Sequence, residues 1–398
     1  MKNIKIYGDA ISANLYLITD FLKRSSIQFS WVSSLTNTNA IRFEDGTIIY
    51  NPTVNEVADK LGWVAEPKCT EYDVSIFGGG VAGLSAAVYA ASEGLRTVIV
   101  ERETIGGQAG TSSLIENYLG FPKGISGAEL ALRAREQALK FGVEILLLKE
   151  GIKGVSKDNN INIQLATGET ITSKTTICAT GVEYAKLNLA NENKYLNKGL
   201  YYGAGASEAP FCKHKDVYVV GGGNSAGQAA VYFSKFAKRV YMVIRKGNLS
   251  ETMSDYLVKH ISTITNISIL YNSEVTDLSG KKGLEAIKIF NSKTNQTDFF
   301  KTSKLFVCIG GKPNTDWAKD TAICRDRNGY LYTGNDLIEL DQYKECWKHD
   351  RQPFHLETSV AGVFAAGDVR FNSVKRVASA VGEGAMAVTQ IHQYLSKL

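Results

Sequence analysis

A glycine-rich turn between a short apolar strand and an alanine-rich helix is the feature that most constrains the fold of this chain. Residues 74–77 have the composition of a buried strand, and Gly-Gly-Gly-Val-Ala-Gly follows at 78–83 before the predicted helix. A second apolar strand covers residues 97–100 and ends at Glu101. In this order, the spaced glycines allow a tight turn, close approach of the backbone to a pyrophosphate, and close packing of helix on strand. The stretch 72–101 therefore predicts a unit that binds a dinucleotide, with the phosphates at the start of the helix.

The same pattern occurs a second time in the chain. Residues 217–220 form an apolar strand that leads into Gly-Gly-Gly-Asn-Ser-Ala at 221–226, and a helix and a strand at 240–244 follow. The two copies align without a gap: GGGVAGLSAAVYAASEGLRTVIVER with GGGNSAGQAAVYFSKFAKRVYMVIR. Two such units in one chain predict two dinucleotides, as a flavin enzyme needs for hydride transfer.

The two copies differ at the position that faces the ribose. Glu101 of the first copy aligns with Ile244 of the second, and Arg245 and Lys246 follow Ile244. A carboxylate at this place binds a ribose 2′-hydroxyl, whereas basic residues accommodate a 2′-phosphate. The first copy is therefore predicted to bind FAD and the second NADPH; the alternative is that Arg245 and Lys246 are solvated surface charges. The residues predicted to contact NADPH are Gly221, Gly223, Asn224, Ser225, Ala226, Arg245 and Lys246.

Length and composition narrow the class of protein further. A chain of 398 residues exceeds one ordinary core and suggests about two or three domains. No apolar run is long enough to cross a bilayer, and the first residues lack the apolar core of a signal peptide, so we expect a cytoplasmic protein. The formal net charge of +5 is small for this length and the basic residues are dispersed, so nucleic acid is not indicated.

The cysteines predict neither a metal site nor a disulfide framework. They are Cys69, Cys178, Cys212, Cys308, Cys324 and Cys346. None of them forms a C-x-x-C pair or a cluster with metal-ligand spacing. Cys178 and Cys308 lie inside apolar runs and are predicted to be core residues.

The segment before the first glycine turn has its own alternation of strands and helices. We expect strands at 3–7 and 28–32, a helix at 13–22, a hairpin at 42–50 that turns at Asp45-Gly46, and a helix at 54–61. This order resembles a shortened glutaredoxin or thioredoxin-like fold. The place of that family's C-x-x-C reads GDAISA at 8–13, without cysteine, so this module cannot do dithiol chemistry itself. We expect it to dock or to stabilise a dimer, and the alternative is a site that recognises a small thiol.

Four separated motifs resemble the low-molecular-weight thioredoxin reductase family of flavoproteins. They are GGQAG at 106–110, IENYLGFP at 115–122, ATG at 179–181, and GD at 367–368 with KRVA at 375–378. In that family the G-G-Q loop and the asparagine of the second motif lie against the flavin ring, and the Gly-Asp pair contacts the pyrophosphate and the ribityl chain. The resemblance implies FAD contacts at Gly78, Gly80, Ala82, Gly83, Glu101, Gly107, Gln108, Asn117, Thr180, Gly181, Gly367, Asp368, Arg376, Val377 and Ala378.

The resemblance covers about residues 72–398 and implies an α/β fold. It implies two Rossmann-like domains of the three-layer ββα type, with the second inserted in the first. The FAD-binding domain would cover 72–182 and 305–398, and the NADPH-binding domain 183–304, after a small thioredoxin-like α/β domain at 1–66. A homodimer is implied as well, and the last helix is expected at 385–395.

The redox C-x-x-C of related thioredoxin reductases is absent. Counting back from Gly221, the equivalent positions hold Ala204-Gly205-Ala206-Ser207, followed by Glu208. Because a thiol–disulfide relay needs two thiols that can close on each other, this chain is not expected to reduce thioredoxin by the usual route. No catalytic residue is assigned. Cys212 is expected to be a packing residue, with a single redox-active thiol as the alternative.

These features predict an enzyme that takes hydride from NADPH and passes electrons from FAD directly to an unidentified acceptor, either a small molecule or a protein carrier. The first alternative is a ferredoxin– or flavodoxin–NADP reductase, which also needs no cysteine pair. A second alternative, from another class, is a flavin-based redox sensor or scaffold. A thioredoxin reductase that uses Cys212 with another cysteine comes last. Nucleic acid, membrane and metal are not among the expected partners.

Overall fold

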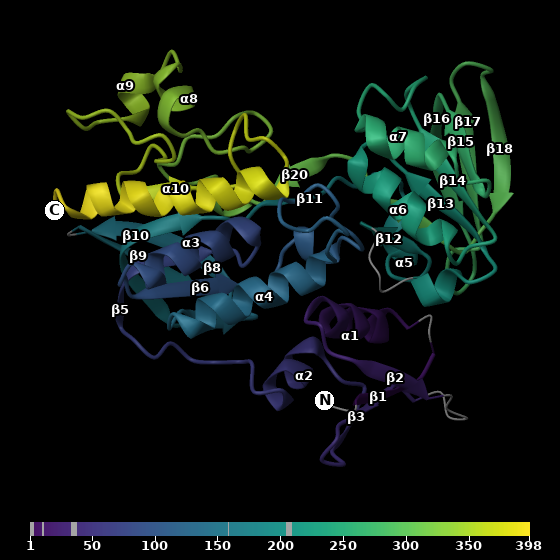
Figure 1. Ribbon diagram of the computed structural model, residues 1–398, viewed down its shortest axis with the longest axis horizontal. Helices are drawn as coiled ribbons and strands as arrows, with labels where there is room; N and C mark the ends of the chain where they lie inside the picture. The colour runs from purple at the N-terminus through teal and green to yellow at the C-terminus, as the bar shows by residue number, and fades with distance from the viewer. Residues whose placement is uncertain (1–3, 10–11, 33–37, 158, 204–208) are drawn as a thin grey trace. The chain divides into compact units, whose positions relative to one another are not determined.

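The computed structural model describes residues 4–9, 12–32, 38–157, 159–203 and 209–398. The chain folds into two compact units, and Figure 1 labels most of their helices and strands. The first unit comprises Met1–Val57, Thr111–Leu114 and Tyr184–Gly311, and the second comprises Ala58–Gly110, Ile115–Glu183 and Lys312–Leu398. The later two chain crossings between the units lie in β11 (Val182–Tyr184) and β20 (Gly311–Pro313), which pair as a two-stranded sheet.

A small α/β region opens the chain. Its elements are β1 (Ile4–Tyr7), α1 (Ala13–Arg24), β2 (Phe29–Val32), β3 (Ala40–Arg42), β4 (Ile48–Tyr50) and α2 (Val54–Lys60). β1 pairs in parallel with β2 and antiparallel with β3, and β3 pairs antiparallel with β4, which gives the order β2-β1-β3-β4. The hairpin turns at Gly46, where Asp45 Oδ1 accepts a hydrogen bond of 2.9 Å from the N–H of Thr47. The predicted elements of this region are confirmed within a few residues.

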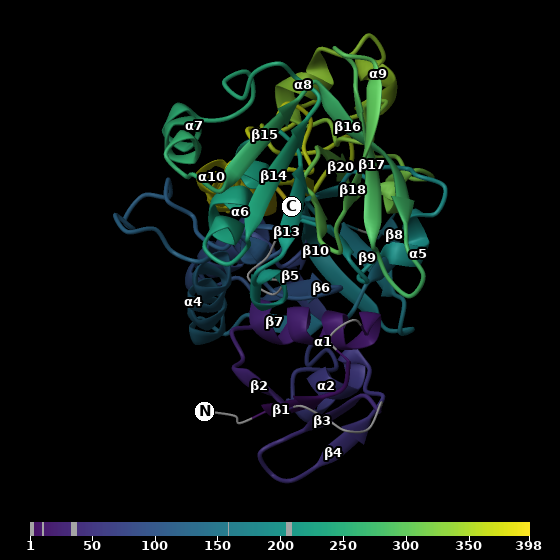
Figure 2. The same ribbon diagram turned by 90° about the vertical axis from the view of Figure 1, so that its right-hand side faces the viewer.

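The rest of the first unit is built on a parallel sheet. Its strands, in the order β12-β19-β13-β14-β15, are β12 (Leu200–Tyr202), β19 (Leu305–Val307), β13 (Asp216–Val220), β14 (Arg239–Ile244) and β15 (Ile267–Tyr271). An antiparallel meander of β16 (Ser273–Ser279), β17 (Ala286–Asn291) and β18 (Gln296–Lys301) follows, as Figure 2 shows, and the helices are α5 (Glu192–Tyr195), α6 (Asn224–Ser234) and α7 (Asp255–Ser262). Val217 and Val219 belong to one buried cluster, and Tyr218 and Val220 to another. Residues 217–220 of strand β13 are apolar because both faces of the strand are covered there.

The second unit is built on a seven-stranded sheet. Strands β7 (Glu144–Leu147), β6 (Thr97–Glu101), β5 (Glu71–Phe77), β10 (Thr170–Cys178) and β21 (Val363–Ala365) are parallel neighbours in that order. Strands β9 (Asn160–Leu165) and β8 (Gly151–Lys157) extend the sheet antiparallel from the first half of β10. The helices are α3 (Val81–Ser92), α4 (Gly127–Lys140), α8 (Gly334–Ile338), α9 (Tyr343–Cys346) and α10 (Val377–Leu395).

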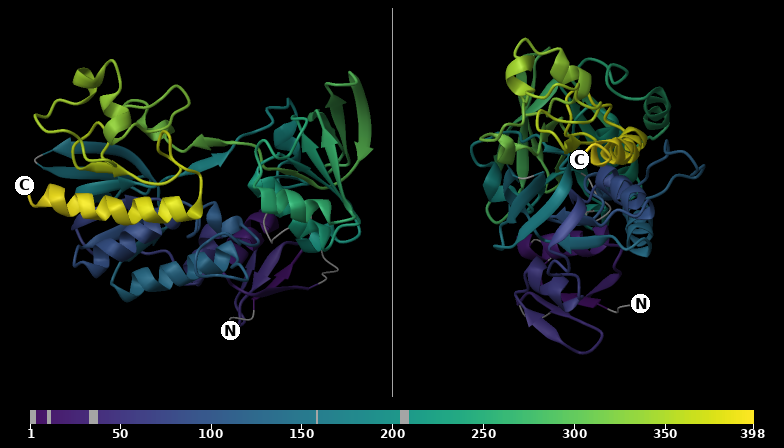
Figure 3. Two further views of the ribbon diagram at one scale, coloured as in Figure 1. Left: turned by 45° about the horizontal axis from the view of Figure 1, so that its top comes forward. Right: turned by 90° about the vertical axis from the view of Figure 1, so that its left-hand side faces the viewer.

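Helix α10, yellow in Figure 3, packs along α3. A β-carbon on Gly384 of α10 would lie closer than 3.0 Å to the carbonyl oxygen of Ala82 in α3, so the helices approach to backbone contact there. Helix α10 begins at Val377, well before residue 385, where the sequence predicted its start. That prediction is wrong because Gly382 and Gly384 do not precede the helix: Gly384 is a packing residue inside it.

The polar segment 320–353 carries a disulfide bond, which the sequence did not predict. Cys324 and Cys346 are bonded, 22 positions apart in the sequence, with their α-carbons 6.6 Å apart. The prediction failed because no spacing motif marks the pair; the segment itself folds back and brings the two cysteines together. The end of the segment is fixed by Arg351, which donates two hydrogen bonds of 2.6 Å to the fully buried carboxylate of Glu357.

We expect Gly384→Ala to destabilise the protein by about 1–3 kcal/mol, because the added methyl group forces α10 away from α3. Gly382→Ala on the same helix is the matched control, since nothing lies within 4 Å of its β-carbon position. The control should stabilise the helix by about 0.5–1 kcal/mol, because alanine loses less backbone entropy than glycine. Urea unfolding followed by circular dichroism measures both effects. Equal effects of the two substitutions would contradict the close helix packing.

Candidate functional site

The first glycine turn lies against the end of strand β10. Gly78 has φ of +110°, and a β-carbon there would lie closer than 3.0 Å to the carbonyl oxygen of Ala179. A β-carbon on Gly83 would meet the carbonyl oxygen of Gly78 equally closely. Packing alone therefore requires glycine at these two positions. Around Gly80, in contrast, no atom lies nearer than 3.9 Å to the β-carbon position, so the space beside it is open to a ligand.

The G-G-Q loop lies beside this turn. The N–H of Gly106 donates to the carbonyl oxygen of Gly79 at 2.7 Å, and a β-carbon on Gly107 would be 3.0 Å from the α-carbon of Gly80. The side-chain amide of Gln108 donates to the carbonyl oxygen of Val182 at 2.6 Å. Two segments that the resemblance assigns to FAD are therefore neighbours in the structure.

Glu101 holds the turn in its conformation. Its carboxylate accepts hydrogen bonds from the N–H of Gly79 at 2.6 Å and from the N–H of Glu103 at 2.7 Å, and the residue is 8% exposed. The sequence predicted that this acid binds a ribose. In the structure this carboxylate ties the end of β6 to the glycine turn.

The C-terminal motif reaches the same place through helix α3. A β-carbon on Gly367 would be 3.0 Å from the β-carbon of Ala82 and 3.6 Å from that of Ala380 in α10. A β-carbon on Gly78 would be 3.1 Å from the α-carbon of Thr180, whose hydroxyl oxygen is buried without a hydrogen-bond partner among the described residues. The start of α3, the end of β10, the Gly-Asp pair and the first turns of α10 therefore converge.

An ion pair that the sequence did not single out supports the Gly-Asp pair. Glu383 of α10 accepts hydrogen bonds from the N–H of Gly367 at 2.6 Å and from the guanidinium of Arg370 at 3.0 and 3.1 Å. The N–H of Gly367 therefore already donates to Glu383. The N–H of Asp368 is the one that could donate a hydrogen bond to a phosphate. Burial raises the pKa of the Asp368 carboxyl, while the Lys375 ammonium opposes this shift. In the sequence, the opposite charges of Arg370 and Glu383, each next to a motif, were the signal that could have predicted this ion pair.

The other residues predicted to contact FAD lie in the loop around Asn117, at the start of α10 and after β10. Asn117 is exposed in the loop between Ile115 and Ile125, whose backbones exchange hydrogen bonds of 2.7 and 3.0 Å. Arg376 is the exposed N-cap residue of α10, and Val377 and Ala378 form the first turn of that helix. Gly181 has φ of +63°, and its carbonyl oxygen accepts from the N–H of Asn314 at 3.0 Å. Within the described part of the chain, no hydrogen bond joins Asn117 or Arg376 to the first glycine turn.

The second glycine turn, in the other unit, repeats the packing of the first. A β-carbon on Gly221, which has φ of +138°, would lie closer than 3.0 Å to the carbonyl oxygen of Cys308. Around Gly223, the N-cap of α6, no atom lies nearer than 4.0 Å to the β-carbon position. The amide of Asn224 exchanges hydrogen bonds of 3.0 and 2.8 Å with Ser254, so it ties the start of α6 to the start of α7. Ala226 is fully buried, and Ser225 is exposed.

Basic residues follow strand β14 at the place where the first copy has its acid. Arg245 and Lys246 are both exposed. Lys246 forms an ion pair of 3.3 Å with Glu251, and Arg245 has no ion-pair partner among the residues that the structure describes. The guanidinium of Arg245 is therefore available for a phosphate, and its planar donor set matches that group.

The residues present fit two dinucleotides. In each turn, packing requires glycine at the first position, and the third position leaves the backbone open, which is the cradle a pyrophosphate needs. The buried Thr180 hydroxyl offers a polar group that a ligand can satisfy at the first turn. In the described ranges, no group of histidine, cysteine or carboxylate side chains could hold a metal ion.

Comparisons with known proteins agree with this geometry. The family described as Pyridine nucleotide-disulphide oxidoreductase matches residues 72–384. A thioredoxin reductase of Ureaplasma parvum is 34% identical over 327 residues, which are 82% of this chain and 97% of that protein. The "34.2 kDa protein in rubredoxin operon" of Clostridium pasteurianum is 34% identical over 330 residues, which are 82% of this chain and 97% of that protein. The crystal structure of T. acidophilum thioredoxin reductase superposes with a TM-score of 0.72 at 30% identity, over 82% of this chain and 99% of that one.

The chain therefore belongs to the pyridine nucleotide-disulphide oxidoreductases and, within them, to the thioredoxin reductase family. It is an oxidoreductase of this type, with FAD and NADPH as its cofactors and two Rossmann-like domains. The α/β region at 1–71 lies outside the family match. Among the described residues, no helix combines the length and the apolar character needed to cross a membrane. The positions equivalent to the family's C-x-x-C and the acid that follows it are 204–208. They lie outside the described residues.

We expect Gly80→Ala to weaken FAD binding about tenfold or more, a loss of about 1.4 kcal/mol, because the methyl group projects into the open space beside the turn. The apoprotein should stay folded. Gly83→Ala is the contrasting variant, since its methyl group would collide with the Gly78 carbonyl and destabilise the fold itself. The ratio of flavin to protein absorbance after gel filtration, with a thermal melt of each apoprotein, separates the two effects. A full flavin content in Gly80→Ala would contradict the placement of the pyrophosphate.

Proposed function

We propose that this protein oxidises NADPH and passes electrons from FAD directly to an acceptor, without a dithiol relay. FAD supplies the redox chemistry, since it accepts hydride from a nicotinamide and gives electrons onward. The residues of the chain bind the two nucleotides, orient their rings and leave the flavin accessible to the acceptor. The observation that carries the proposal is the placement of the cysteines.

The chain has no C-x-x-C, and Ala204 and Ser207 stand where related thioredoxin reductases carry the pair. The buried cysteines do not replace it. Cys212 is fully buried, and Cys178 and Cys308 are 3% and 7% exposed. Burial raises the pKa of the Cys178 thiol to about 12, which suppresses the reactive thiolate.

The other cysteines do not form such a relay either. Cys69 is exposed in the segment between α2 and β5, and Cys324 and Cys346 are bonded to each other in the excursion at 320–353. These observations support the flavin as the last redox centre of the main electron path.

We propose that each predicted residue acts at its nucleotide as the geometry suggests. Gly80 and Gly223 give access to the two pyrophosphates, Glu101 binds the FAD ribose, and Asp368 binds the ribityl chain. Arg245 and Lys246 bind the 2′-phosphate. The remaining predicted contacts are supported by their places on the same loops and helix starts, and Asn117 would have to approach the flavin from its exposed loop.

We propose domain boundaries at 72–182 with 305–398 for FAD, 183–304 for NADPH, and 1–66 for the first domain. The paired crossings β11 and β20 support an NADPH domain that is inserted in the FAD domain. The links at 182–187 and 303–310 are the proposed hinges, because rotation of one domain brings nicotinamide and flavin together in the family.

The first domain is proposed to be a thioredoxin-like module that docks and does no dithiol chemistry. The strand order β2-β1-β3-β4 supports this likeness. The rings of Tyr16 and Tyr201 lie 5.0 Å apart, and those of Trp31 and Phe211 lie 5.8 Å apart, all within the first unit. These aromatic contacts support a packing role, and a homodimer is proposed from the resemblance.

A protein electron carrier is the second candidate for the acceptor. The relative from Clostridium pasteurianum is named for its place in a rubredoxin operon, which favours a small redox protein over a free small molecule. The corresponding function is that of a ferredoxin– or flavodoxin–NADP reductase.

Anaerobic reduction with NADPH, followed by mixing with single acceptors, tests the proposal. We expect the flavin to be reduced and then reoxidised by dioxygen, a quinone, a ferredoxin or a flavodoxin, and we expect no reduction of thioredoxin. Cys212→Ser should keep this activity, because its thiol takes no part. Reduction of thioredoxin that Cys212→Ser abolishes would contradict the proposal, and a flavin that NADPH fails to reduce would indicate a redox sensor.

We expect Arg245→Ala with Lys246→Ala to lower kcat/KM for NADPH about 10- to 100-fold, since a hydrogen bond to a charged group contributes about 1.5–3 kcal/mol. The value for NADH should stay nearly unchanged. Lys238→Ala removes another exposed charge, just before β14, and is the matched control. Steady-state kinetics with both nucleotides at one ionic strength measure the effect. An NADPH preference that survives the double substitution would overturn the assignment.

A further inference from the structure

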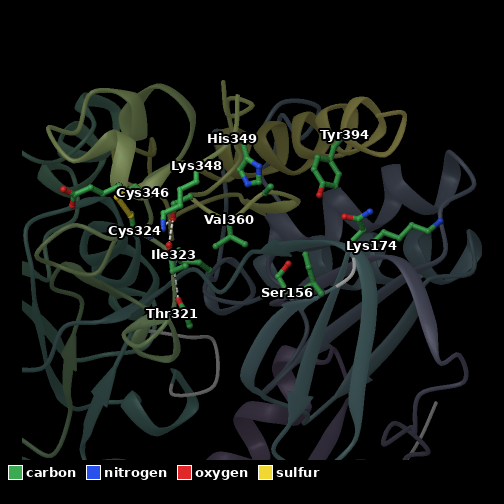
Figure 4. A pocket seen from close by; sticks show the side chains of 16 residues that line it. Ser156, Lys174, Thr321, Ile323, Cys324, Cys346, Lys348, His349, Val360 and Tyr394 are labelled. Atoms are coloured by element: carbon green, nitrogen blue, oxygen red, sulfur yellow. Dashed lines mark hydrogen bonds between the residues drawn. A yellow bond between two sulfur atoms is a disulfide. The ribbon is translucent and has the colours of Figure 1, made fainter. Parts of the chain in front are cut away.

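The Cys324–Cys346 disulfide forms part of the wall of a cavity of about 560 Å³ in the second unit (Figure 4). Residues of strands β8 to β10, the excursion at 320–353 and the end of α10 line this cavity. Both cysteines are half-buried and are among the residues that line the cavity. None of the residues predicted to contact FAD or NADPH is among the lining residues.

The two cysteines are anchored differently. The N–H of Cys324 donates to the hydroxyl oxygen of Ser359 at 2.7 Å, and that hydroxyl donates to the carbonyl oxygen of Ala322 at 2.7 Å. Cys346 ends the single-turn helix α9, and the next residue, Trp347, is 4% exposed. The buried Trp347 anchors the chain beside Cys346.

Two lysines, Lys174 and Lys348, line the cavity together with His349, and Glu345 is the carboxylate among its described lining residues. Lys174 is paired with Asp73 at 2.9 Å, whereas Lys348 has no ion-pair partner among the described residues. In the view of Figure 4, Lys348 and His349 lie between the disulfide and Tyr394. A small molecule that enters beside the disulfide therefore meets an ammonium group that forms no ion pair with the described residues.

We propose that this cavity is a thiol–disulfide exchange site for small anionic thiols. It is separate from the electron path of the proposed function and does not depend on it. The Lys348 ammonium attracts a carboxylate, sulfonate or phosphate on the thiol, and the disulfide in the wall is the group that reacts. The volume of about 560 Å³ suits a molecule of this size.

The exchange is a two-step oxidation of thiol by the protein disulfide. A thiolate attacks one Sγ, a new S–S bond forms, and the Cys324–Cys346 bond breaks; the electron pair goes to the other Sγ, which takes a proton from water. A second thiolate then attacks the outer sulfur and releases the small disulfide, and the attacked cysteine leaves as a thiolate. Two thiols are oxidised to one disulfide, and the two cysteines are reduced.

The rate of this reduction with thiols of different charge tests the proposal. The full-length oxidised protein is mixed anaerobically with 2-mercaptoethanesulfonate, 2-mercaptoethanol or cysteamine at equal thiolate concentration, then acid-quenched and alkylated. Mass spectrometry of the Cys324 and Cys346 peptides measures the reduced fraction. We expect the anionic thiol to react about fivefold faster than the neutral one and the cationic thiol to react slowest, as a single nearby charge predicts. High salt should shrink these differences.

Lys348→Gln should remove most of the preference for the anionic thiol. Lys344→Gln, an exposed position of α9 that does not line the cavity, is the matched control and should keep it. The salt dependence of the wild-type protein provides the same information should a variant fold poorly. Equal rates for the three thiols, a preference that survives both Lys348→Gln and high salt, or a disulfide that reacts only after unfolding would each overturn the proposal.

Discussion

The backbone of the first glycine turn and the end of strand β10 approach so closely at Gly78 that no side chain fits between them, and the second unit depends on this approach. It sets where α3 begins, and α10 follows because Gly384 packs on the backbone of α3. Thr180, Gly367 and the start of α10 are thereby brought to one place. The same contact recurs at Gly221 in the first unit. Each nucleotide site is therefore a consequence of how tightly a strand, a turn and a helix pack.

Short sequence patterns correctly predicted the features that depend on neighbouring residues. The glycine turns, the strand–helix order and the Asp45-Gly46 hairpin follow from backbone conformation and hydrophobic periodicity, which neighbouring residues determine. The start of α10 was mispredicted because the last helix was expected only from residue 385, while the structure places Gly382 and Gly384 inside it and packs Gly384 on the backbone of α3. The Cys324–Cys346 bond and the Arg370–Glu383 pair were missed for a related reason. Both join segments whose proximity only the folded chain shows.

The two glycine turns differ in the charge of the side chains beside them. A buried acid at the end of β6 completes the first turn, and exposed cations after β14 complete the second. The cysteines also differ in their surroundings. Cys178, Cys212 and Cys308 are buried in the cores, while the disulfide borders a cavity lined by the Lys348 ammonium group. We propose that hydride enters at the flavin and that electrons leave from it, while the disulfide reacts with small thiols.

An anaerobic titration with NADPH, followed by the flavin absorbance, distinguishes a flavin that acts alone from one that feeds a disulfide. We expect one equivalent of NADPH per FAD to bleach the flavin completely, because no dithiol pair draws electrons from it. The Cys324–Cys346 bond should remain oxidised at that point, as alkylation would show. Consumption of a second equivalent before the flavin is fully bleached, with a cysteine pair reduced in step, would contradict the account.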